Sequence, residues 1–280
     1  GNTVIEASKN PICDVPKMCF GNQPRDGGHF VLSTEQKEQV ISQDPTIEKF
    51  IHPYIGAEEF IKGKERWCFW LKGITPAELK SHKILYDIVC KVREFRLASR
   101  AKTTNGYAKV PHLFAQITQP EGKDYILVPR VSSENRVYIP IGFNTANVVA
   151  SDAVQIIPDA SLYHFGVLES SVHMAWMRMV CGRLESRYRY SKEIVYNNFP
   201  WPKVTEAQRA KIEATAQAIL DARRLYPDSS LADLYDDVTM PIELRKAHTA
   251  NDIAVLEAYG LPKSTAEPAI VAHLFTLTAH

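Results

Sequence analysis

The longest apolar stretch of the chain runs from His164 to Met179, where hydrophobic side chains would cover nearly every side of a helix. A helix with this pattern is expected to lie in a protein core. The sequence then changes to a segment rich in basic, aromatic and amide side chains, which ends at Pro200 and Pro202. A core element that continues directly into a charged surface is typical of a rigid scaffold that presents a recognition site.

Shorter patterns predict the elements that precede this stretch. Ser33-Thr-Glu-Gln36 has the sequence of a capping box, which predicts a helix to about Ser42. An apolar stripe with helical spacing predicts another helix between Ala77 and Arg100. Short runs separated by turn residues predict strands at 29–32, 66–71, 112–116, 125–129, 137–140 and 154–157, with a turn at 51–56.

After Pro202 the pattern becomes helical. Thr205-Glu-Ala-Gln208 is a second capping box, whose helix is predicted to end near Arg224, and shorter helices are predicted at 231–236, 241–248 and 251–259. The sequence therefore predicts the α+β class, with a mixed or antiparallel sheet and packed helices followed by a small all-helical C-terminal subdomain. We expect an irregular lead-in at 1–48, a sheet-containing domain at 49–202 and a helical domain at 203–280.

The formal net charge of +1 hides an uneven distribution of charged residues. Seven basic residues accompany two acids between Ser81 and Val110, and five accompany one acid between Arg178 and Lys192. From residue 203 to residue 260, ten acidic residues outnumber seven basic ones. This distribution fits a protein with one side directed at a polyanion, and it fits ordinary solvated faces about equally well.

Composition also bears on the compartment. The five cysteines form no CxxC or CxxH pair, and three of them lie in strongly apolar surroundings that suit small buried thiols. No run of 18 apolar residues and no signal-peptide pattern occurs in the sequence. We therefore expect a reduced, cytoplasmic protein without a membrane partner. The chain begins Gly-Asn-Thr without a methionine, from which we expect a piece of a longer protein.

The sequence lacks the motifs that would define an enzyme. It contains no GxxxxGK[ST] loop, no GxGxxG after a strand, no GxSxG and no HExxH. Asn10-Pro-Ile-Cys13 is similar to the start of an adenine-methylation motif, but it lacks the second proline and the aromatic residue that stacks on a flipped base. His164 and His173 flank the apolar helix and are expected to be interior or rim histidines. We therefore expect neither catalytic residues nor a metal site in this chain.

Two pairs of side chains match the chemistry of base readout. Glu185 and Arg187 are two positions apart, so in extended structure they share one side of the backbone. The glutamate can accept from cytosine N4 while the arginine donates to guanine O6 and N7, which matches a C·G pair in the major groove. Arg130 and Asp152 offer the same combination if a sheet brings their strand ends together. Either pair alone is more often an ordinary salt bridge.

Basic side chains near these pairs are candidates for phosphate contacts. Arg183, Arg189 and Lys192 surround the first pair, and tyrosines and asparagines nearby add further hydrogen-bonding groups. Arg96 and Arg100 lie on the predicted exposed face of the 77–100 helix. A basic helix face is more often simply solvated, so these two are weaker candidates.

Several long motifs carry a family resemblance. They are HFGVL…HMAW…CGRLESRYRYS…VYNNFPWP, FGNQPRDGGHFVLS, YIGAEEFIKGKERWCFWL, PRVSSENRVYIPIGF and LADLYDDVTMPIELRKAHTANDIAVLEAYG. From about Asn22 to Gly260 the chain closely resembles the target-recognition region of MmeI-like type II restriction–modification enzymes. In these enzymes one polypeptide joins a nuclease, an adenine-specific DNA methyltransferase and a recognition domain.

The resemblance implies a methyltransferase domain upstream, which would hold S-adenosylmethionine, whereas this chain would hold no cofactor. Residues 49–202 would bind double-stranded DNA. The parent would be a prokaryotic, cytoplasmic, adenine-specific DNA methyltransferase, with or without an endonuclease activity.

The resemblance also assigns roles to individual residues. In the family, the residues on either side of the Ser in the GRL-x-S-x segment read one base pair together, and here they are Glu185 and Arg187. The residue before VSSE and the residue after the Ser of ASDA would form a second pair. They correspond to Arg130 and Asp152, with Ala153 facing another base.

A different class of function stays open from the sequence. The acidic helical tail could be the working surface of a protein–protein interaction or structural module without DNA specificity, with the basic segments as solvated faces. Competition between specific and random DNA duplexes at two salt concentrations would distinguish the two classes.

Overall fold

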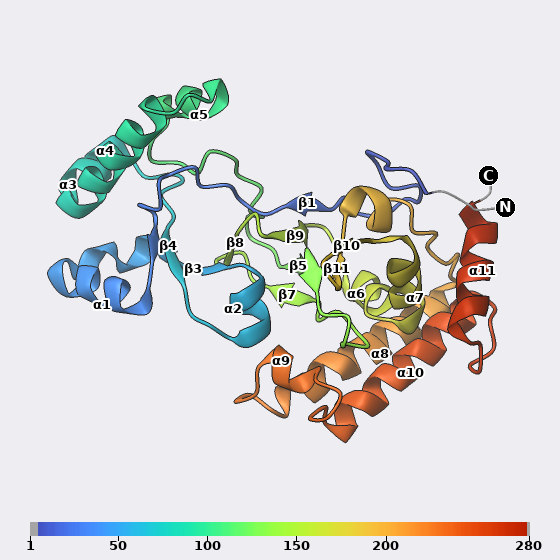
Figure 1. The fold of residues 1–280 in the computed structure, drawn as a ribbon. Helices are drawn as coiled ribbons and strands as arrows, with labels where there is room; N and C mark the ends of the chain where they lie inside the picture. The colour runs from blue at the N-terminus through green and yellow to red at the C-terminus, as the bar shows by residue number, and fades with distance from the viewer. Residues whose placement is uncertain (1–4, 279–280) are drawn as a thin grey trace. The chain divides into compact units, whose positions relative to one another are not determined.

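The computed structural model describes residues 5–278, and the chain divides into two compact units. Unit 1 consists of Gly1–Cys19, Asp124–Asn144 and Gln155–His280, and unit 2 consists of Phe20–Lys123 and Thr145–Val154. Figure 1 shows the elements in chain order. Sheets and helices occur together, and the chain is helical from residue 206 onward, so the predicted α+β class with a helical C-terminal part is confirmed.

Unit 2 is built on a four-stranded sheet with the order β2-β4-β3-β8. β4 pairs antiparallel with β2 and β3, whereas β3 pairs parallel with β8. One hydrophobic cluster joins strand residues to the apolar side of α4. The strands are β2 (Val31–Leu32), β3 (Ile51–Ile55), β4 (Trp67–Phe69) and β8 (Val149–Ala150); the helices are α1 (Thr34–Gln43), η1 (Pro45–Phe50), α2 (Ala57–Lys62), α3 (Pro76–Ser81), α4 (Lys83–Leu97), α5 (Lys102–Gly106) and η2 (Tyr107–Lys109).

The capping box at Ser33 is confirmed, because its side chain accepts from the backbone of Gln36 and the Gln36 side chain accepts in return. The single helix predicted at 77–100 is wrong. It is divided at His82, which has extended backbone angles (φ −107°, ψ 94°) and ends α3 while beginning α4. The Nδ1 atom of His82 lies 2.9 Å from an Asp44 carboxylate oxygen, which holds this break in place.

The turn predicted at 51–56 is also wrong, because β3 occupies 51–55. Pro53 had indicated a turn, since proline has no N–H to donate to a sheet. In the structure Pro53 pairs with Trp67, and the pairing of β3 with β8 starts only at Tyr54. The missing N–H therefore does not interrupt that second ladder.

Arg96 lies inside unit 2 rather than on the exposed face of α4. Its side chain is 0% exposed, and its five N–H groups donate to five backbone carbonyls at 2.6 to 3.0 Å. The carbonyls are those of Pro24, Arg25, Tyr107, Val110 and Leu113. The expected phosphate contact at Arg96 is therefore wrong, because the guanidinium has no N–H left to donate. Burial also holds the pKa of Arg96 below its usual value.

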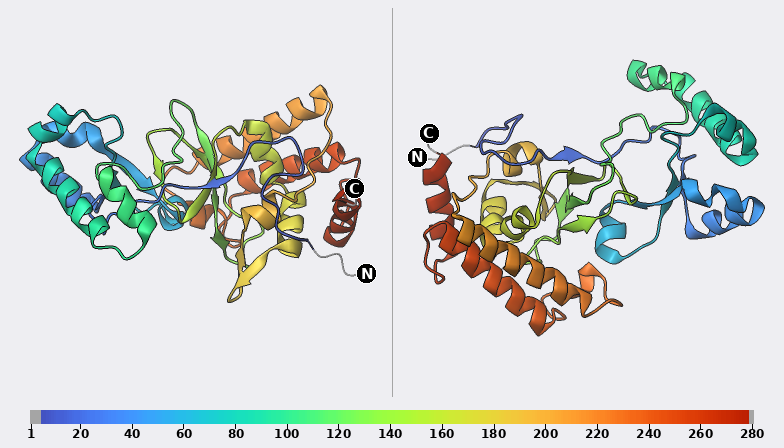
Figure 2. Two further views of the ribbon diagram at one scale, coloured as in Figure 1. Left: turned by 90° about the horizontal axis from the view of Figure 1, so that it is seen from above. Right: turned by 180° about the vertical axis from the view of Figure 1, so that it is seen from behind.

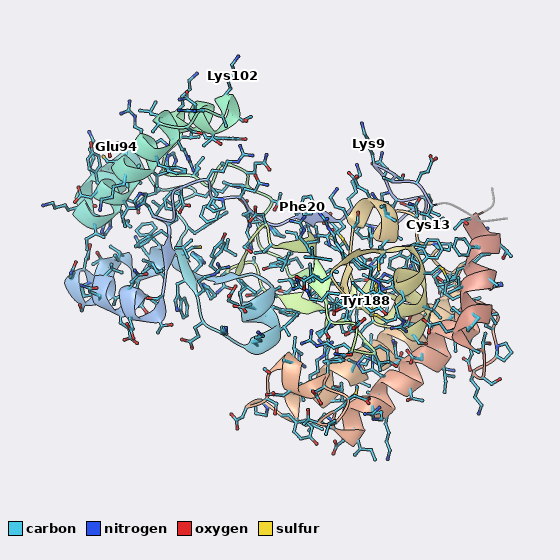
Figure 3. All side chains as sticks on the ribbon, in the orientation of Figure 1. Lys9, Cys13, Phe20, Glu94, Lys102 and Tyr188 are labelled. Atoms are coloured by element: carbon cyan, nitrogen blue, oxygen red, sulfur yellow. The ribbon has the colours of Figure 1, made fainter. Side chains whose placement is uncertain are left out.

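The exposed side of α4 and α5 carries other charges. Glu94 and Lys102 are labelled in Figure 3, and both are exposed. Arg100, between the two helices, is exposed as well, so its expected phosphate contact stays a prediction.

Two sheets of the described residues lie mainly in unit 1. In one of them β5 (Tyr125–Pro129) lies between β9 (Val154–Ile157) and β7 (Gly142–Asn144), with β1 (Cys19–Phe20) next to β9. The strands predicted at 125–129 and 154–157 are thus confirmed. The other sheet has the order β10-β11-β6, from β10 (Gly182–Leu184), β11 (Arg187–Arg189) and β6 (Val131–Ser132).

The strands predicted at 112–116 and 137–140 are wrong, since both segments are irregular apart from an isolated bridge at Gln116. In the second segment, helix side chains replace a strand neighbour. The Val137 carbonyl accepts from Arg178, and the Ile139 N–H lies 3.4 Å from the Met174 sulfur. Backbone groups satisfied in this way do not require a ladder.

The long apolar stretch is buried as predicted, but it forms two helices, α6 (Leu162–Leu168) and α7 (Ser171–Val180). Ser170 caps α7 and Glu169 turns inward between the helices. Gly166 is required for packing, because a Cβ there would lie 2.7 Å from the Ile212 side chain on α8. The other helices are η3 (Lys192–Tyr196), α8 (Glu206–Arg224), α9 (Leu231–Leu234), α10 (Ile242–Ala258) and α11 (Glu267–Thr278).

The C-terminal helices follow the prediction in part. α8 begins at the predicted cap Thr205, and α8 and α10 lie side by side (Figures 1 and 2). The two helices predicted at 241–248 and 251–259 are one helix, and α11 was not predicted. Asn251 suggested a new helix start, but its buried amide instead bonds Gly166 on α6 and Thr215 on α8. Among residues 5–278, no helix is both long and apolar enough for a membrane span.

Candidate nucleic-acid interface

The basic segment after α7 forms a β-hairpin. β10 and β11 are antiparallel, and because Leu184 pairs with Arg187 the connection is the two-residue turn Glu185-Ser186. Glu185 has φ of 57°, in the left-handed region. A positive φ at the first turn position belongs to the turn types that fit the twist of a hairpin. For a residue other than glycine this conformation costs about 1–2 kcal/mol, so Glu185 holds a strained position at the tip.

The structure brings Glu185 and Arg187 together. An Arg187 nitrogen lies 3.7 Å from a Glu185 carboxylate oxygen, and the two side chains are 80% (Glu185) and 46% (Arg187) exposed. An ion pair this exposed contributes at most about 1 kcal/mol. Replacing this ion pair by contacts of the two side chains with a ligand would therefore cost little free energy.

The strand register places the hairpin's side chains on two faces. Paired residues share a face and neighbours along a strand alternate. Arg183 pairs with Tyr188, and these two share one face; Arg187 and Arg189 lie on the other. Tyr188, labelled in Figure 3, is 8% exposed and belongs to the core cluster of unit 1, so its face is directed toward the protein. The face with Arg187 and the exposed Arg189 is directed outward.

Tyr190, just after β11, fixes the base of the hairpin. Its N–H donates to the Arg130 carbonyl at 2.7 Å, and its hydroxyl lies 2.9 Å from Nε2 of His173. The other ring nitrogen of His173 lies 2.7 Å from the Leu168 carbonyl, so a neutral ring donates there and accepts from Tyr190. His173 is 0% exposed, and burial lowers its pKa to about 4. The expectation of an interior histidine is confirmed for His173.

This histidine makes stability depend on pH. Below about pH 6.5 the unfolded chain takes up a proton at His173 that the folded chain accepts only near pH 4. The free energy of unfolding should therefore fall as the pH drops through this range, by roughly 3 kcal/mol in total from this residue. The variant His173→Gln keeps a donor and an acceptor but cannot titrate. In urea unfolding between pH 7 and pH 4, the free energy of unfolding of the unsubstituted chain should fall more steeply than that of His173→Gln. Parallel curves would contradict the assignment of His173 as a buried, neutral histidine.

Asn197 and Asn198, expected to add hydrogen-bonding groups around the bases, instead bind the lead-in segment. The amide nitrogen of Asn197 donates to the Ser8 carbonyl and that of Asn198 to the Glu6 carbonyl, both at 2.7 Å. Lys192 begins η3, and its side chain is 20% exposed, with Nζ 3.7 Å from Glu193. The segment after the hairpin therefore both anchors the lead-in and retains one candidate phosphate contact.

The second predicted pair is distributed over both units. Arg130 is half-buried in unit 1 between β5 and β6, while Asp152, half-buried, and Ala153, exposed, follow β8 in unit 2. A joint role for Arg130 and Asp152 stays a prediction. Ser151 lies close against Gly21, where a Cβ would stand 1.9 Å from the Ser151 carbonyl oxygen.

Two buried amides support the segment before Asp152. Asn22 donates to Gln119 at 2.9 Å and to the Ala150 carbonyl at 2.8 Å. Gln119 in turn donates to the carbonyls of Ala146 and Val148 at 2.9 and 2.8 Å. In the sequence, Asn22 is only part of the FGNQP motif that carries the family resemblance. The structure shows that its side chain supports the segment before Asp152.

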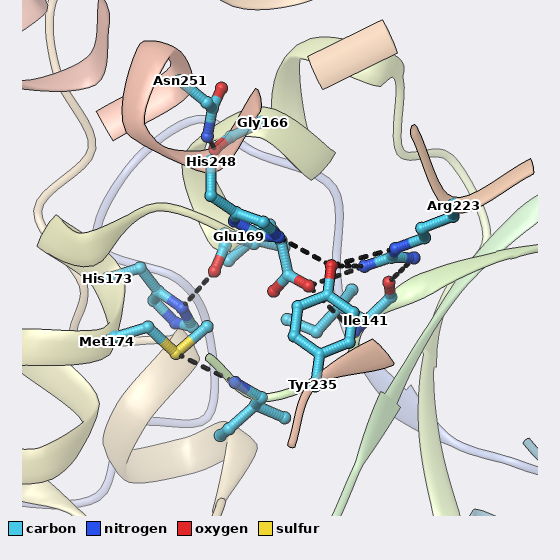
Figure 4. A network of polar contacts seen from close by, with 11 residues as sticks. Ile141, Gly166, Glu169, His173, Met174, Arg223, Tyr235, His248 and Asn251 are labelled. Carbon is cyan, nitrogen blue, oxygen red and sulfur yellow. Dashed lines mark hydrogen bonds and ion pairs between the residues drawn. The ribbon is translucent and has the colours of Figure 1, made fainter. Parts of the chain in front are cut away.

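A buried polar network, not foreseen from the sequence, fixes the chain between β6 and β7 (Figure 4). Arg223 on α8 donates to the Ile141 carbonyl and to Glu169, both at 2.7 Å. Glu169 is 0% exposed, and burial raises its pKa while the guanidinium of Arg223 opposes that rise. Tyr235 joins Arg223 to His248, at 2.8 Å and 2.7 Å. Residues so far apart in the chain leave no local pattern that could reveal them.

Metal coordination finds no support in the described part of the chain. Residues 5–278 contain no group of three or more histidine, cysteine, aspartate or glutamate residues placed to hold a metal ion. His164, at the rim of the core, has its pKa lowered to about 4 by burial, and its Nδ1 lies 2.9 Å from the Ser161 N–H.

An exposed two-stranded hairpin with a donor and an acceptor at its tip has dimensions and chemistry compatible with contacts to base edges in a major groove. Comparison with known families agrees with a nucleic-acid recognition domain. Residues 1–203 match the family model of the MmeI target recognition domain, and residues 204–280 match that of the MmeI C-terminal domain. The chain belongs to the MmeI family.

Two relatives give the scale of the similarity. DNA methyltransferase A of Bacillus subtilis (strain 168) is 37% identical over 258 residues, which is 92% of this chain and 29% of that protein. The structure of the Type IIL restriction-modification enzyme MmeI in complex with DNA has 45% identity and a TM-score of 0.94, over 99% of this chain and 37% of that chain. This chain thus spans about a third of the length of these relatives.

Proposed function

We propose that this chain recognises a specific sequence in double-stranded DNA for an adenine-specific DNA methyltransferase. The observation that carries the proposal is the pair Glu185 and Arg187 at the tip of an exposed hairpin. Together they offer an acceptor and a two-pronged donor on one element narrow enough to enter a major groove. The solved relative in complex with DNA supports a DNA ligand.

The pair is proposed to read one C·G base pair. Glu185 accepts from cytosine N4, and Arg187 donates to guanine O6 and N7. Arg130 and Asp152 are proposed as a second pair, with Ala153 against a further base. Each correct contact of this kind contributes about 1–3 kcal/mol of discrimination.

Other basic residues are proposed to grip the DNA backbone. Arg189 lies on the outward face of the hairpin, Lys192 begins the next element, and Arg100 lies on the exposed side of unit 2. Such contacts position the duplex without selecting its sequence.

The methyl transfer itself belongs to the parent polypeptide. We propose an upstream methyltransferase domain that binds S-adenosylmethionine and receives the target adenine, in a prokaryotic cytoplasm. Endonuclease activity of the parent is a separate proposal, which rests on the restriction-modification relative alone.

Removing a backbone contact should weaken binding to every sequence alike. In the intact parent polypeptide, Lys192→Gln is expected to lower the affinity for specific and random duplexes by the same factor. The slope of log affinity against log salt concentration (the salt slope) should become smaller by about 1. The ratio of the two affinities should not change. Competition binding at two salt concentrations measures both quantities, with Lys203→Gln, on an exposed residue after the hairpin region, as a matched charge control.

The same experiment tests the proposed function. If the unmodified parent binds specific and random duplexes equally at both salt concentrations, sequence recognition is excluded and a protein–protein module is the better account. A clear preference for the specific duplex supports recognition by this chain.

A further inference from the structure

Arg183, on β10, makes three contacts in and beside the hairpin, and its side chain is 47% exposed. Its Nη1 donates to the Ser186 carbonyl in the turn at 2.8 Å. Its guanidinium lies 4.1 Å from the centre of the Tyr188 ring, within the range of a cation–π interaction. A Glu134 carboxylate oxygen, from the loop after β6, lies 3.7 Å from the same nitrogen.

The hydrogen bond to the turn and the contact with Tyr188 set Arg183 apart, whereas an acidic residue at 3.7 Å is common to Arg183, Arg187 and Lys192. By the strand register it lies on the Tyr188 face of the hairpin, opposite to the face that carries Arg187 and Arg189. Its Nη1 atom, which donates to the Ser186 carbonyl, is also the atom nearest to Glu134, and its guanidinium lies against the Tyr188 ring. Both facts reduce what it can offer to a phosphate.

The turn needs such support. Glu185 is held at φ 57°, a conformation that a non-glycine residue keeps only when its surroundings enforce it. The bond from Arg183 to the Ser186 carbonyl fixes the second residue of the same turn. Stacking on the buried Tyr188 in turn fixes Arg183. The tip is thereby tied to the core through one guanidinium.

We propose that Arg183 is a positioning residue for base recognition, which acts through Glu185 and Arg187 rather than by contact with a phosphate. The proposal rests on the proposed function and deepens it. Glu134 and Tyr188 complete the clamp, and none of the three needs to touch DNA. A planar guanidinium is required, because an ammonium cannot stack on the ring and donate to the turn in the same way.

The test compares Arg183→Gln with Lys192→Gln in the intact parent. Each variant is measured for affinity to the specific duplex, to the duplex altered at the C·G pair, and to random duplex at two salt concentrations. For Arg183→Gln we expect discrimination at that one base pair to fall about tenfold, within the range of one readout contact. Its affinity for random DNA, and the slope of that affinity against salt concentration, should also change. Both changes should be less than about half of those that the loss of one phosphate contact produces. For Lys192→Gln we expect a lower affinity for random DNA and a smaller salt slope, with discrimination at the C·G pair unchanged.

Two further variants keep the result decisive if Arg183→Gln does not fold. Arg183→Lys retains the charge, so it should restore binding if the residue contacts a phosphate, and should leave discrimination low if it positions the turn. Glu134→Gln removes the carboxylate that restrains Arg183. It should lower discrimination about two- to fivefold if Glu134 helps to position Arg183, and leave discrimination unchanged if Arg183 contacts a phosphate.

The outcomes separate this proposal from the one on which it rests. Equal weakening toward all duplexes in Arg183→Gln, with a reduced salt slope and recovery in Arg183→Lys, would overturn the positioning role while leaving sequence recognition intact. No discrimination by the unmodified parent would overturn both.

Discussion

In the intact parent, the double substitution Glu185→Lys and Arg187→Asp is expected to reverse the preference at one base pair from C·G to G·C. The donor and the acceptor exchange places along the same hairpin, so the matching bases exchange strands. Each member contributes about 1–3 kcal/mol, so the preference should invert by at least about tenfold in each direction. The measurement is methylation of duplexes that differ only at that pair.

The single substitutions provide the control. Glu185→Lys alone places two donors at the tip, and Arg187→Asp alone places two acceptors, so each should lose activity on both duplexes. The double substitution leaves the net charge of the hairpin unchanged. Binding to random DNA and its salt dependence should therefore equal those of the parent. Activity of the double variant on the original site alone would contradict the assignment.

The substitution Arg96→Met is expected to lower the free energy of unfolding by about 3 kcal/mol. It removes five hydrogen bonds to partly buried carbonyls, of which those of Pro24, Tyr107 and Val110 also accept from a backbone N–H. Arg96→Lys should not restore the loss, since one ammonium cannot replace a planar fork that serves two separate loops. Arg93→Met, an exposed residue one turn earlier on α4, is the matched control and should change stability by no more than about 0.5 kcal/mol.

Denaturant unfolding of the 280-residue chain measures these differences, and hydrogen exchange locates them. The loss in Arg96→Met should appear in unit 2, at the loops around Pro24 and from Tyr107 to Leu113. Unchanged unfolding of Arg96→Met would mean that water satisfies these carbonyls, and the bracing role of Arg96 would be wrong.

Local sequence signals predicted those parts of the fold that local physics determines. The capping boxes at Ser33 and Thr205 begin α1 and α8, and the fully apolar strand at 125–129 is β5. The pair Glu185 and Arg187 could be singled out because a spacing of two places side chains on one side of a strand. The structure adds that they meet at a turn, with Glu185 strained.

The errors arise where tertiary contacts decide. Arg96 has the sequence signature of an exposed helix position, and only the two loops that it binds make its burial favourable. Asn251 has the signature of a helix start, but its side chain is used inside α10 to bind two other helices. None of these partners is near in sequence.

The modified motif in genomic DNA tests the central claim most directly. Cells that express the intact parent gene, and cells that express its Glu185→Lys, Arg187→Asp form, would be sequenced for N6-methyladenine. The account predicts two motifs that differ at a single position, C in one and G in the other. Identical motifs from the two strains would contradict base reading by Glu185 and Arg187.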